Sequence, residues 1–465
     1  MTAPAIWIIF PILMAFSLFL IRGRQLLKFY LGAFISLFLA FLALVIPIGE
    51  VINIGNLTIQ VNPSLIVLGR QFILDQGDNT ILVLTYGMGF FWFFGGLVSR
   101  PRTSFVSIGL AMLAILVAAI SVDPFLFSAL LIEIAVLITI PMIASPGMPA
   151  GRGVQRYLVF LTLGMPFILL AGWALGGSGA NLGDPNLIIS AAFLLGLGFA
   201  FLLAVFPFYT WIPLIAEEVN PFVSGFIFAA LPVMILFILL DFLNGLAIIR
   251  ESDLIFKALQ LCGILMIATG GIWAAFQKNI ARLFGYMVII ETGFFLFAIG
   301  MKSQLGLDYF AFMILPRMIE IGLIALGLSL VIKSLGNLDS YNLASLFRRM
   351  PFAAGAITAG LFSMVGIPLL AEFSLKFELL ANYSVRRPGT TVWIFIGILG
   401  SLVAIFRFLA VFIGNPGDHA RISESRLGRV LILIGVASLI FIGLFPRFFL
   451  QGMTQILTAF PMLKW

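Results

Sequence analysis

The chain has 465 residues, 62% of them hydrophobic and 10% charged, with a mean hydropathy of +1.19. These values lie far outside the range of soluble domains, so the composition excludes a soluble enzyme and indicates an integral membrane protein. The net charge of +7 requires no nucleic-acid partner. Basic residues of membrane proteins face the inner leaflet and its anionic lipids, which accounts for such an excess.

Apolar segments of about the length that crosses a bilayer recur along the whole sequence and predict an all-α polytopic membrane protein of about 14 transmembrane helices. They cover residues 5–21, 29–49, 80–98, 104–121, 124–145, 157–176, 187–212, 221–245, 255–276, 283–301, 309–332, 353–380, 391–414 and 430–446. No small-residue cleavage pattern follows the first segment, so we expect a retained helix there. The longest loop, 50–79, alternates apolar and polar residues, which predicts a small extramembrane hairpin.

The distribution of basic residues predicts the orientation. Fifteen Lys and Arg residues fall on one side of the expected helices and eight on the other, while Arg317, Lys376 and Arg407 lie inside the spans. By the positive-inside rule, both termini are expected on the outer side.

Cysteine and histidine are too scarce for most cofactor sites. Cys262 is the single cysteine, so it forms no internal disulfide and holds no iron–sulfur cluster. His419, the single histidine, lies in a polar loop beside Asp418, so no His-based metal or haem site is expected. No complete Gly-x-Gly-x-x-Gly or P-loop motif is present. We therefore expect no redox cofactor or nucleotide in this chain itself.

Lys376 lies in an otherwise apolar segment, eight residues after a break at Gly366 and Pro368. A charge in the middle of the bilayer costs roughly 2.5–3.5 kcal/mol on insertion scales, so an intramembrane lysine is a functional candidate. Interrupted membrane helices also tend to line water or an ion path. The alternative is a structural role, because Glu372 lies four residues earlier in the order that favours an ion pair.

Glu133 is flanked by apolar residues for almost two turns on each side. A buried carboxylate with a cation nearby suits a group that takes and releases a proton. Arg156, at the start of the next expected helix, is the expected partner, although it also suits an interfacial arginine whose charge reaches the membrane surface.

Four further ionisable residues fall within later spans: Glu291, Arg317, Glu320 and Arg407. Arg317 and Glu320 are three residues apart, close enough to neutralise each other on one helix face. Such groups on consecutive helices are what a proton relay requires. The alternative is a set of ion pairs that holds the helices together.

Two segments of the chain are similar to each other. Ile212-Pro-Leu-Ile-Ala-Glu217 is similar to Ile367-Pro-Leu-Leu-Ala-Glu372, and each lies at a proline-broken span. The two spans are five helices apart, which reverses their orientation in the membrane, as inverted repeats require.

These motifs together resemble the antiporter-like membrane subunits of respiratory complex I, which share a superfamily with Mrp-type sodium/proton antiporters and membrane-bound hydrogenases. Glu133 matches the family's glutamate on the fifth helix, and Arg156-Tyr157 stands where the family has Lys-Tyr. Phe206-Pro-Phe-Tyr-Thr-Trp-Ile-Pro213 resembles the family's Val-Pro-Phe-His-x-Trp-x-Pro. Gln277–Tyr286 and Leu361–Phe377 resemble two further motifs, the second of which makes Lys376 the family lysine of the broken twelfth helix.

The resemblance covers roughly residues 80–410 and implies a division of the chain into four parts. Residues 1–100 hold three helices and the loop 50–79, residues 104–245 and 255–414 form two inverted five-helix repeats, and residues 430–465 form the last helix and a short tail. Helices seven and twelve are expected to break at Pro207, Pro213, Gly366 and Pro368. The short tail favours the type called subunit N, or subunit 2.

The chain also departs from the family pattern. The family's lysine on the seventh helix falls on Leu202, and residues 203–249 contain no Lys, Arg or His. The motif's own histidine is Tyr209, and the usual lysine of the eleventh helix falls near Ile319. The N-terminal half therefore keeps Glu133 but lacks the base that the family glutamate is thought to modulate.

The sequence thus predicts a proton-translocating membrane-arm subunit of a complex-I-like NADH (or ferredoxin):quinone oxidoreductase. Flavin, iron–sulfur clusters and quinone are expected in partner subunits, and a bacterial inner membrane is the expected location, with thylakoids or another energy-coupling membrane as alternatives. The alternatives for function are an Mrp-type Na⁺/H⁺ antiporter, a hydrogenase subunit, or a scaffold that transports nothing.

Overall fold

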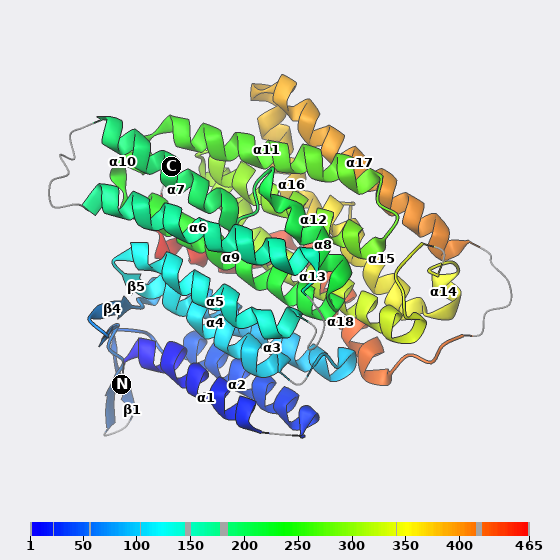
Figure 1. Ribbon diagram of the computed structural model, residues 1–465, viewed down its shortest axis with the longest axis horizontal. Helices are drawn as coiled ribbons and strands as arrows, with labels where there is room; N and C mark the ends of the chain where they lie inside the picture. Colours follow the sequence, from blue (N-terminus) through cyan, green and yellow to red (C-terminus); the bar gives the residue numbers. More distant parts are fainter. Residues whose placement is uncertain are drawn as a thin grey trace.

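The structure is a computed structural model that describes residues 2–21, 23–54, 57–102, 104–144, 150–176, 185–340, 342–414 and 421–463. His419 and Asp418, on which the exclusion of a histidine site rests, lie outside these residues. Within them the chain is almost entirely helical, and the long helices run side by side (Figure 1). In the described part of the chain, ten helices are long and apolar enough to cross a membrane.

The helices begin and end close to where the sequence predicts them. They are α1 (Phe10–Leu20), α2 (Gln25–Val45), α3 (Asn79–Ser99), α4 (Phe105–Ser121), α5 (Ser128–Ile143), α6 (Arg152–Gly176), α7 (Pro185–Leu202), α8 (Trp211–Glu218), α9 (Pro221–Gly245), α10 (Ala247–Glu251), α11 (Asp253–Ala275), α12 (Ile280–Gly300), α13 (Gln304–Leu335), α14 (Leu346–Arg349), α15 (Pro351–Val365), α16 (Phe373–Arg386), α17 (Pro388–Ile413), α18 (Arg426–Leu444) and α19 (Pro446–Met453). Four shorter apolar helices, Ala5–Leu20, Phe105–Ser121, Ile189–Leu202 and Pro351–Val365, fall on further expected spans. The helical membrane fold is confirmed, while the count of fourteen spans and the repeat boundaries stay predictions.

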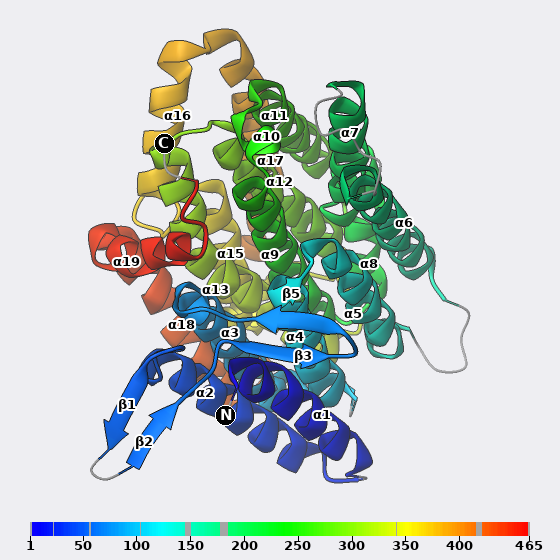
Figure 2. The same ribbon diagram turned by 90° about the vertical axis from the view of Figure 1, so that its left-hand side faces the viewer.

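The loop 50–79 forms two β-hairpins where one was predicted. Strands β1 (Val51–Ile54) and β2 (Leu57–Gln60) pair antiparallel, and β3 (Ser64–Val67) pairs with β4 (Arg70–Ile73). β4 also pairs with β5 (Val122–Asp123), at the end of α4. Figure 2 shows both hairpins at one end of the helix bundle.

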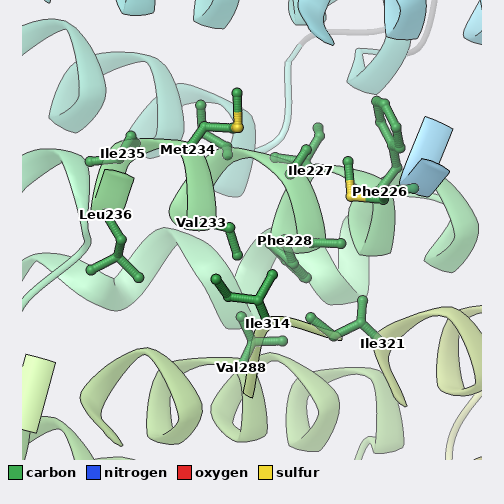
Figure 3. Packing of buried hydrophobic residues seen from close by; sticks show 14 of the residues in the cluster. Phe226, Ile227, Phe228, Val233, Met234, Ile235, Leu236, Val288, Ile314 and Ile321 are labelled. Atoms are coloured by element: carbon green, nitrogen blue, oxygen red, sulfur yellow. The ribbon is translucent and has the colours of Figure 1, made fainter. Parts of the chain in front are cut away.

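Among the long helices α9 and α12 are the most deeply buried: 94% of the most apolar 18-residue stretch of each is buried, against 22% for α18. Figure 3 shows this packing around α9. The labelled members of the buried cluster are Phe226, Ile227, Phe228, Val233, Met234, Ile235 and Leu236 of α9, Val288 of α12, and Ile314 and Ile321 of α13. Outside this centre α11 and α17 approach backbone to backbone, since a Cβ on Gly271 would overlap the carbonyl of Gly397.

Two spans are interrupted, as predicted. α7 ends at Leu202 and α8 begins at Trp211, and Pro207 lies in the segment between them. α15 ends at Val365, and the next residue, Gly366, has a φ of +87°, a left-handed conformation that glycine adopts without a steric penalty; Pro368 follows before α16 begins.

Pro213 is not part of a break, contrary to the prediction. It is the third residue of α8. The first N–H groups of a helix have no partner within it, so proline is tolerated there and the helix continues.

Candidate functional site

Five charged side chains gather inside the C-terminal half of the bundle. Glu291 lies in the middle of α12, Arg317 and Glu320 lie on α13, Glu372 precedes α16, and Lys376 lies in its first turn. None is more than 3% exposed. The sequence predicted each of them as a candidate, and the structure brings them together; we call them the charged cluster.

Arg317 connects α13 to two neighbouring helices. Its guanidinium is 3.2 Å from the Glu291 carboxylate, and it donates hydrogen bonds to Thr292 Oγ1 (3.1 Å) and to the Phe228 carbonyl of α9 (3.3 Å). The expected pairing of Arg317 with Glu320 is therefore wrong. A long arginine side chain reaches across to a facing helix, so spacing along its own helix does not decide its partner.

Lys376 is bound within the break of the α15–α16 span. Its ammonium donates to Glu372 Oε2 (2.5 Å) and to the Met364 carbonyl (2.7 Å), and it lies 4.3 Å from the centre of the Phe294 ring. The last four carbonyls of a helix have no partner within it. Because α15 ends at Val365, the Met364 carbonyl has no partner within the helix and is available to the lysine. The predicted pair of Glu372 with Lys376 is confirmed.

Glu320 is buried without a hydrogen-bonded partner at either carboxylate oxygen. The Ser363 hydroxyl, which also lacks a partner, lies beside it. One carboxylate oxygen each of Glu291, Glu320 and Glu372 lies within 4.8 Å of the other two. Three carboxylates thus face two cations, and one proton or one monovalent cation would make the cluster neutral.

The N-terminal half holds a smaller polar group around Glu133 of α5. Thr162 of α6 donates to Glu133 Oε1 (2.8 Å), while Oε2 is buried without a partner. Nearby, the hydroxyls of Tyr157 and Thr139 share a hydrogen bond of 2.9 Å. Sequence reasoning missed Thr162 and Thr139; the signal for them is a hydroxyl within an apolar span.

Arg156 does not pair with Glu133, contrary to the prediction. It is exposed, on the same face of α6 as the exposed Val159 and Leu163. Tyr157, Leu161 and Ile168 occupy the buried face instead. Successive helical residues differ by about a quarter turn, so the neighbouring tyrosine points inward while Arg156 points outward.

Arg407 is not buried, again contrary to the prediction. Its exposed guanidinium donates to the Ala275 carbonyl (2.7 Å) and to the Gln277 carbonyl, at the C-terminal end of α11. An arginine at that position satisfies unpaired carbonyls and complements the negative end of the helix dipole. Arg407 is therefore a helix cap and not a member of the charged cluster.

Aromatic side chains separate the two polar groups. The rings of Tyr157 and Trp211 lie 5.1 Å apart, and those of Trp211 and Phe228 lie 6.2 Å apart. The Phe228 carbonyl then reaches Arg317. Leu202, at the end of α7, is 3% exposed. Along this line the contacts between the Glu133 group and the charged cluster are made by aromatic rings and a backbone carbonyl.

The fold and the site together define a class: a polytopic membrane protein with two broken helices and a cluster of buried charged residues beside one of the breaks. The family model described as "NADH:quinone oxidoreductase/Mrp antiporter, TM" matches residues 170–403. The chain belongs to this family and is a multi-pass membrane protein, which confirms the resemblance seen in the sequence.

Relatives carry a consistent name. The "NADH-quinone oxidoreductase subunit N" of Moorella thermoacetica is 30% identical over 299 residues, covering 62% of this chain and 60% of that protein. The same subunit of Ectopseudomonas mendocina is 27% identical over 317 residues, covering 63% of each. The matches thus span less than two thirds of these curated relatives' length.

Solved structures share the fold over nearly the whole chain. A chain of an archaeal membrane-bound sulfane sulfur reductase has a TM-score of 0.82 at 19% identity, covering 99% of this chain and 97% of that one. A chain of the Mrp complex from Dietzia sp. has a TM-score of 0.80 at 14% identity, covering 99% of both. A chain of respiratory complex I from Thermus thermophilus has a TM-score of 0.73 at 19% identity, covering 97% and 99%.

Proposed function

We propose that the chain is an antiporter-like membrane-arm subunit of a complex-I-like NADH (or ferredoxin):quinone oxidoreductase, in which it moves protons through its C-terminal half. The family and the name of its relatives support this assignment. Its partners are the other membrane-arm subunits, which carry the redox chemistry with flavin, iron–sulfur clusters and quinone. The membrane is the bacterial inner membrane, with both termini outside.

The charged cluster is the observation that carries the proposal. Its three carboxylates and two cations lie in a site with almost no solvent exposure, where charges interact strongly. A proton bound at Glu320 or Glu291 therefore changes the strength of both ion pairs at once. Lys376 donates its hydrogen bonds to Glu372 and to the Met364 carbonyl at the break, so a weakened pair with Glu372 frees its ammonium to exchange a proton.

The N-terminal half is a degenerate half-channel under this proposal. Glu133 keeps a hydrogen-bonded partner, Thr162, but α7 and α9 supply no Lys, Arg or His. The Trp211 and Phe228 rings lie between Glu133 and the cluster. Protons consequently enter and leave through the C-terminal repeat.

Two alternatives share the fold. An Mrp-type Na⁺/H⁺ antiporter or a membrane-bound hydrogenase subunit would use the same cluster, and the neutralising charge could then be Na⁺. A scaffold that transports nothing is favoured by one observation: both ion pairs of the cluster are fully buried, as pairs that only join helices would be.

The test compares Lys376→Ala with Glu133→Gln in the assembled complex, reconstituted in vesicles. Proton uptake is measured together with the rate of electron transfer. We expect Lys376→Ala to lower the protons moved per electron and Glu133→Gln to have a smaller effect. If neither variant changes proton movement, the proposed proton relay is wrong, and the alternative of a scaffold that transports nothing is favoured.

A further inference from the structure

Aromatic rings close one side of the charged cluster. Phe294 follows Glu291 by three residues on α12, about one turn, and its ring covers the Lys376 ammonium at 4.3 Å. Phe297 lies another turn along α12, and Tyr309 of α13 lies beside Phe294, with the two ring centres 6.5 Å apart. None of the three aromatic residues is more than 2% exposed. The lysine is therefore covered by rings on this side.

A pair of hydroxyl groups lies beyond these rings, at the end of the bundle where α16 turns into α17 (Figure 2). The Tyr383 ring meets the Phe297 ring edge-on, with centres 4.8 Å apart, and the tyrosine is 5% exposed. Its hydroxyl shares a hydrogen bond of 2.8 Å with Thr390 Oγ1. Thr390 is exposed in the first turn of α17. The pair thus links the buried Phe297 ring to the surface.

The stretch between Lys376 and the Tyr383 hydroxyl is apolar. The two residues are seven positions apart on α16, nearly two full turns, so they share one face of the helix about 10 Å apart along its axis. Leu379 and Leu380 are the buried residues between them. A buried water needs roughly two to four polar partners. With the rings in place, this stretch cannot hold a continuous chain of water.

The other side of the cluster is polar. Glu320 lies eleven residues after Tyr309 on α13, about 16 Å further along the helix axis. Both of its carboxylate oxygens and the Ser363 hydroxyl beside it are buried without a partner. Unpaired buried polar atoms are where ordered water binds in proteins. Water can therefore reach the cluster at Glu320, while the aromatic rings exclude it beyond Lys376.

We propose that Phe294 and Phe297 form a gate between Lys376 and the Tyr383–Thr390 pair, and that protons leave the cluster through it. This inference rests on the proposed function, proton movement through the C-terminal half. A hydrophobic constriction blocks conduction because it is dry, and it conducts once water enters.

The transfer needs water as its carrier. When the Phe294 and Phe297 rings turn aside, the Lys376 ammonium gives one proton to a water molecule between them. That water passes a proton to the Tyr383 hydroxyl oxygen, and Tyr383 releases its own hydroxyl proton through Thr390 to bulk water. Lys376 is left as a neutral amine and takes its next proton from the cluster.

The experiment uses vesicles that contain the assembled complex. Without an electron donor, the decay of an imposed pH gradient measures the proton leak. Phe297→Ala removes the ring between Lys376 and Tyr383, so we expect the gradient to decay several-fold faster. Adding Lys376→Met to this variant should restore the slow decay, because the leak passes through the lysine. Tyr383→Phe keeps the ring but removes the hydroxyl, and should lower the protons moved per electron without a leak.

Matched controls separate the gate from a general loosening of the fold. Phe237→Ala removes an equally buried phenylalanine of α9 that packs on Phe310 and lies outside the proposed path. Tyr86→Phe removes a buried hydroxyl that donates to the Trp7 carbonyl. Neither should change the leak or the protons moved per electron. A leak in Phe237→Ala as large as that in Phe297→Ala would overturn the proposal.

Two further outcomes would also overturn the gate: a slow decay in Phe297→Ala, or an unchanged ratio of protons to electrons in Tyr383→Phe. Tyr383→Phe preserves the packing, so it tests the path even where Phe297→Ala does not assemble. If Lys376→Ala lowers the ratio while these two variants have no effect, the gate is wrong and the proposed function stands. If Lys376→Ala also has no effect, the proposed function itself fails.

Discussion

The Lys376 ammonium donates a hydrogen bond of 2.7 Å to the Met364 carbonyl, twelve residues earlier in the chain and on the other side of the helix break. The break at Gly366 therefore does more than interrupt a helix. It releases a carbonyl that an unbroken helix would use, and it turns the chain so that the lysine reaches back to that carbonyl. The buried lysine and the break depend on each other.

This dependence predicts that Gly366→Ala is harmful. The residue has a φ of +87°, and an added Cβ would lie 3.2 Å from Lys376 Cδ. The left-handed conformation alone costs a non-glycine residue roughly 1–2 kcal/mol. We expect a lower midpoint of thermal unfolding in detergent. Gly355→Ala is the control, because this helical glycine of α15 faces open space and should lose nothing.

Two ion pairs that involve arginine, one buried and one partly exposed, should differ in their contribution to stability. Glu291→Gln leaves the buried Arg317 without its charged partner, which typically costs about 3–5 kcal/mol. Glu217→Gln breaks a pair with Arg282 whose side chains are 32% and 41% exposed, so we expect less than about 1 kcal/mol. Thermal unfolding of the two variants side by side measures the difference. Equal losses would mean that Arg317 is not held by Glu291.

Glu320→Gln should keep or increase the stability of the fold. The carboxylate has no hydrogen-bonded partner, and its removal leaves two carboxylates facing two cations. A neutral amide of the same shape also avoids the cost of an unpaired buried charge. The midpoint of thermal unfolding reports this effect. A large drop would show that Glu320 is needed to hold the helices together and would favour the scaffold.

Arg407→Ala should lower stability by about 1 kcal/mol and leave proton movement per electron unchanged. Its guanidinium satisfies carbonyls at the end of α11 and lies outside the charged cluster. Thermal unfolding and proton uptake by the reconstituted complex measure the two effects separately. A loss of proton movement in a variant that still assembles would place Arg407 on the path after all.

Local contacts were predictable from the sequence, and contacts between helices were not. The break at Gly366 and Pro368 and the pair of Glu372 with Lys376 follow from neighbours in the chain. Glu291 and Arg317 meet only because α12 packs against α13. Their 26-residue separation carries no signal of that contact.

The exposure of the charged residues was the least predictable feature. A soluble helix shows which face is buried because its other face is polar. In a membrane helix the lipid-facing and the core-facing sides are both apolar, so Arg407 looks buried in the sequence although it faces outward. For the same reason the sequence left open whether Arg156 is the partner of Glu133 or an interfacial arginine. The sequence likewise predicts a helix break at Pro213, because it does not show that this proline lies in the first turn of α8, where proline is tolerated.

The most direct test of the relay is the number of protons moved per electron by the assembled complex that carries Glu320→Gln. This variant removes the unbalanced charge while leaving both ion pairs intact. Lys257→Ala, at an exposed position of α11, serves as the control. We predict a lower ratio for Glu320→Gln at an undiminished quantity of assembled complex, and an unchanged ratio for the control. An unchanged ratio for Glu320→Gln would contradict the account.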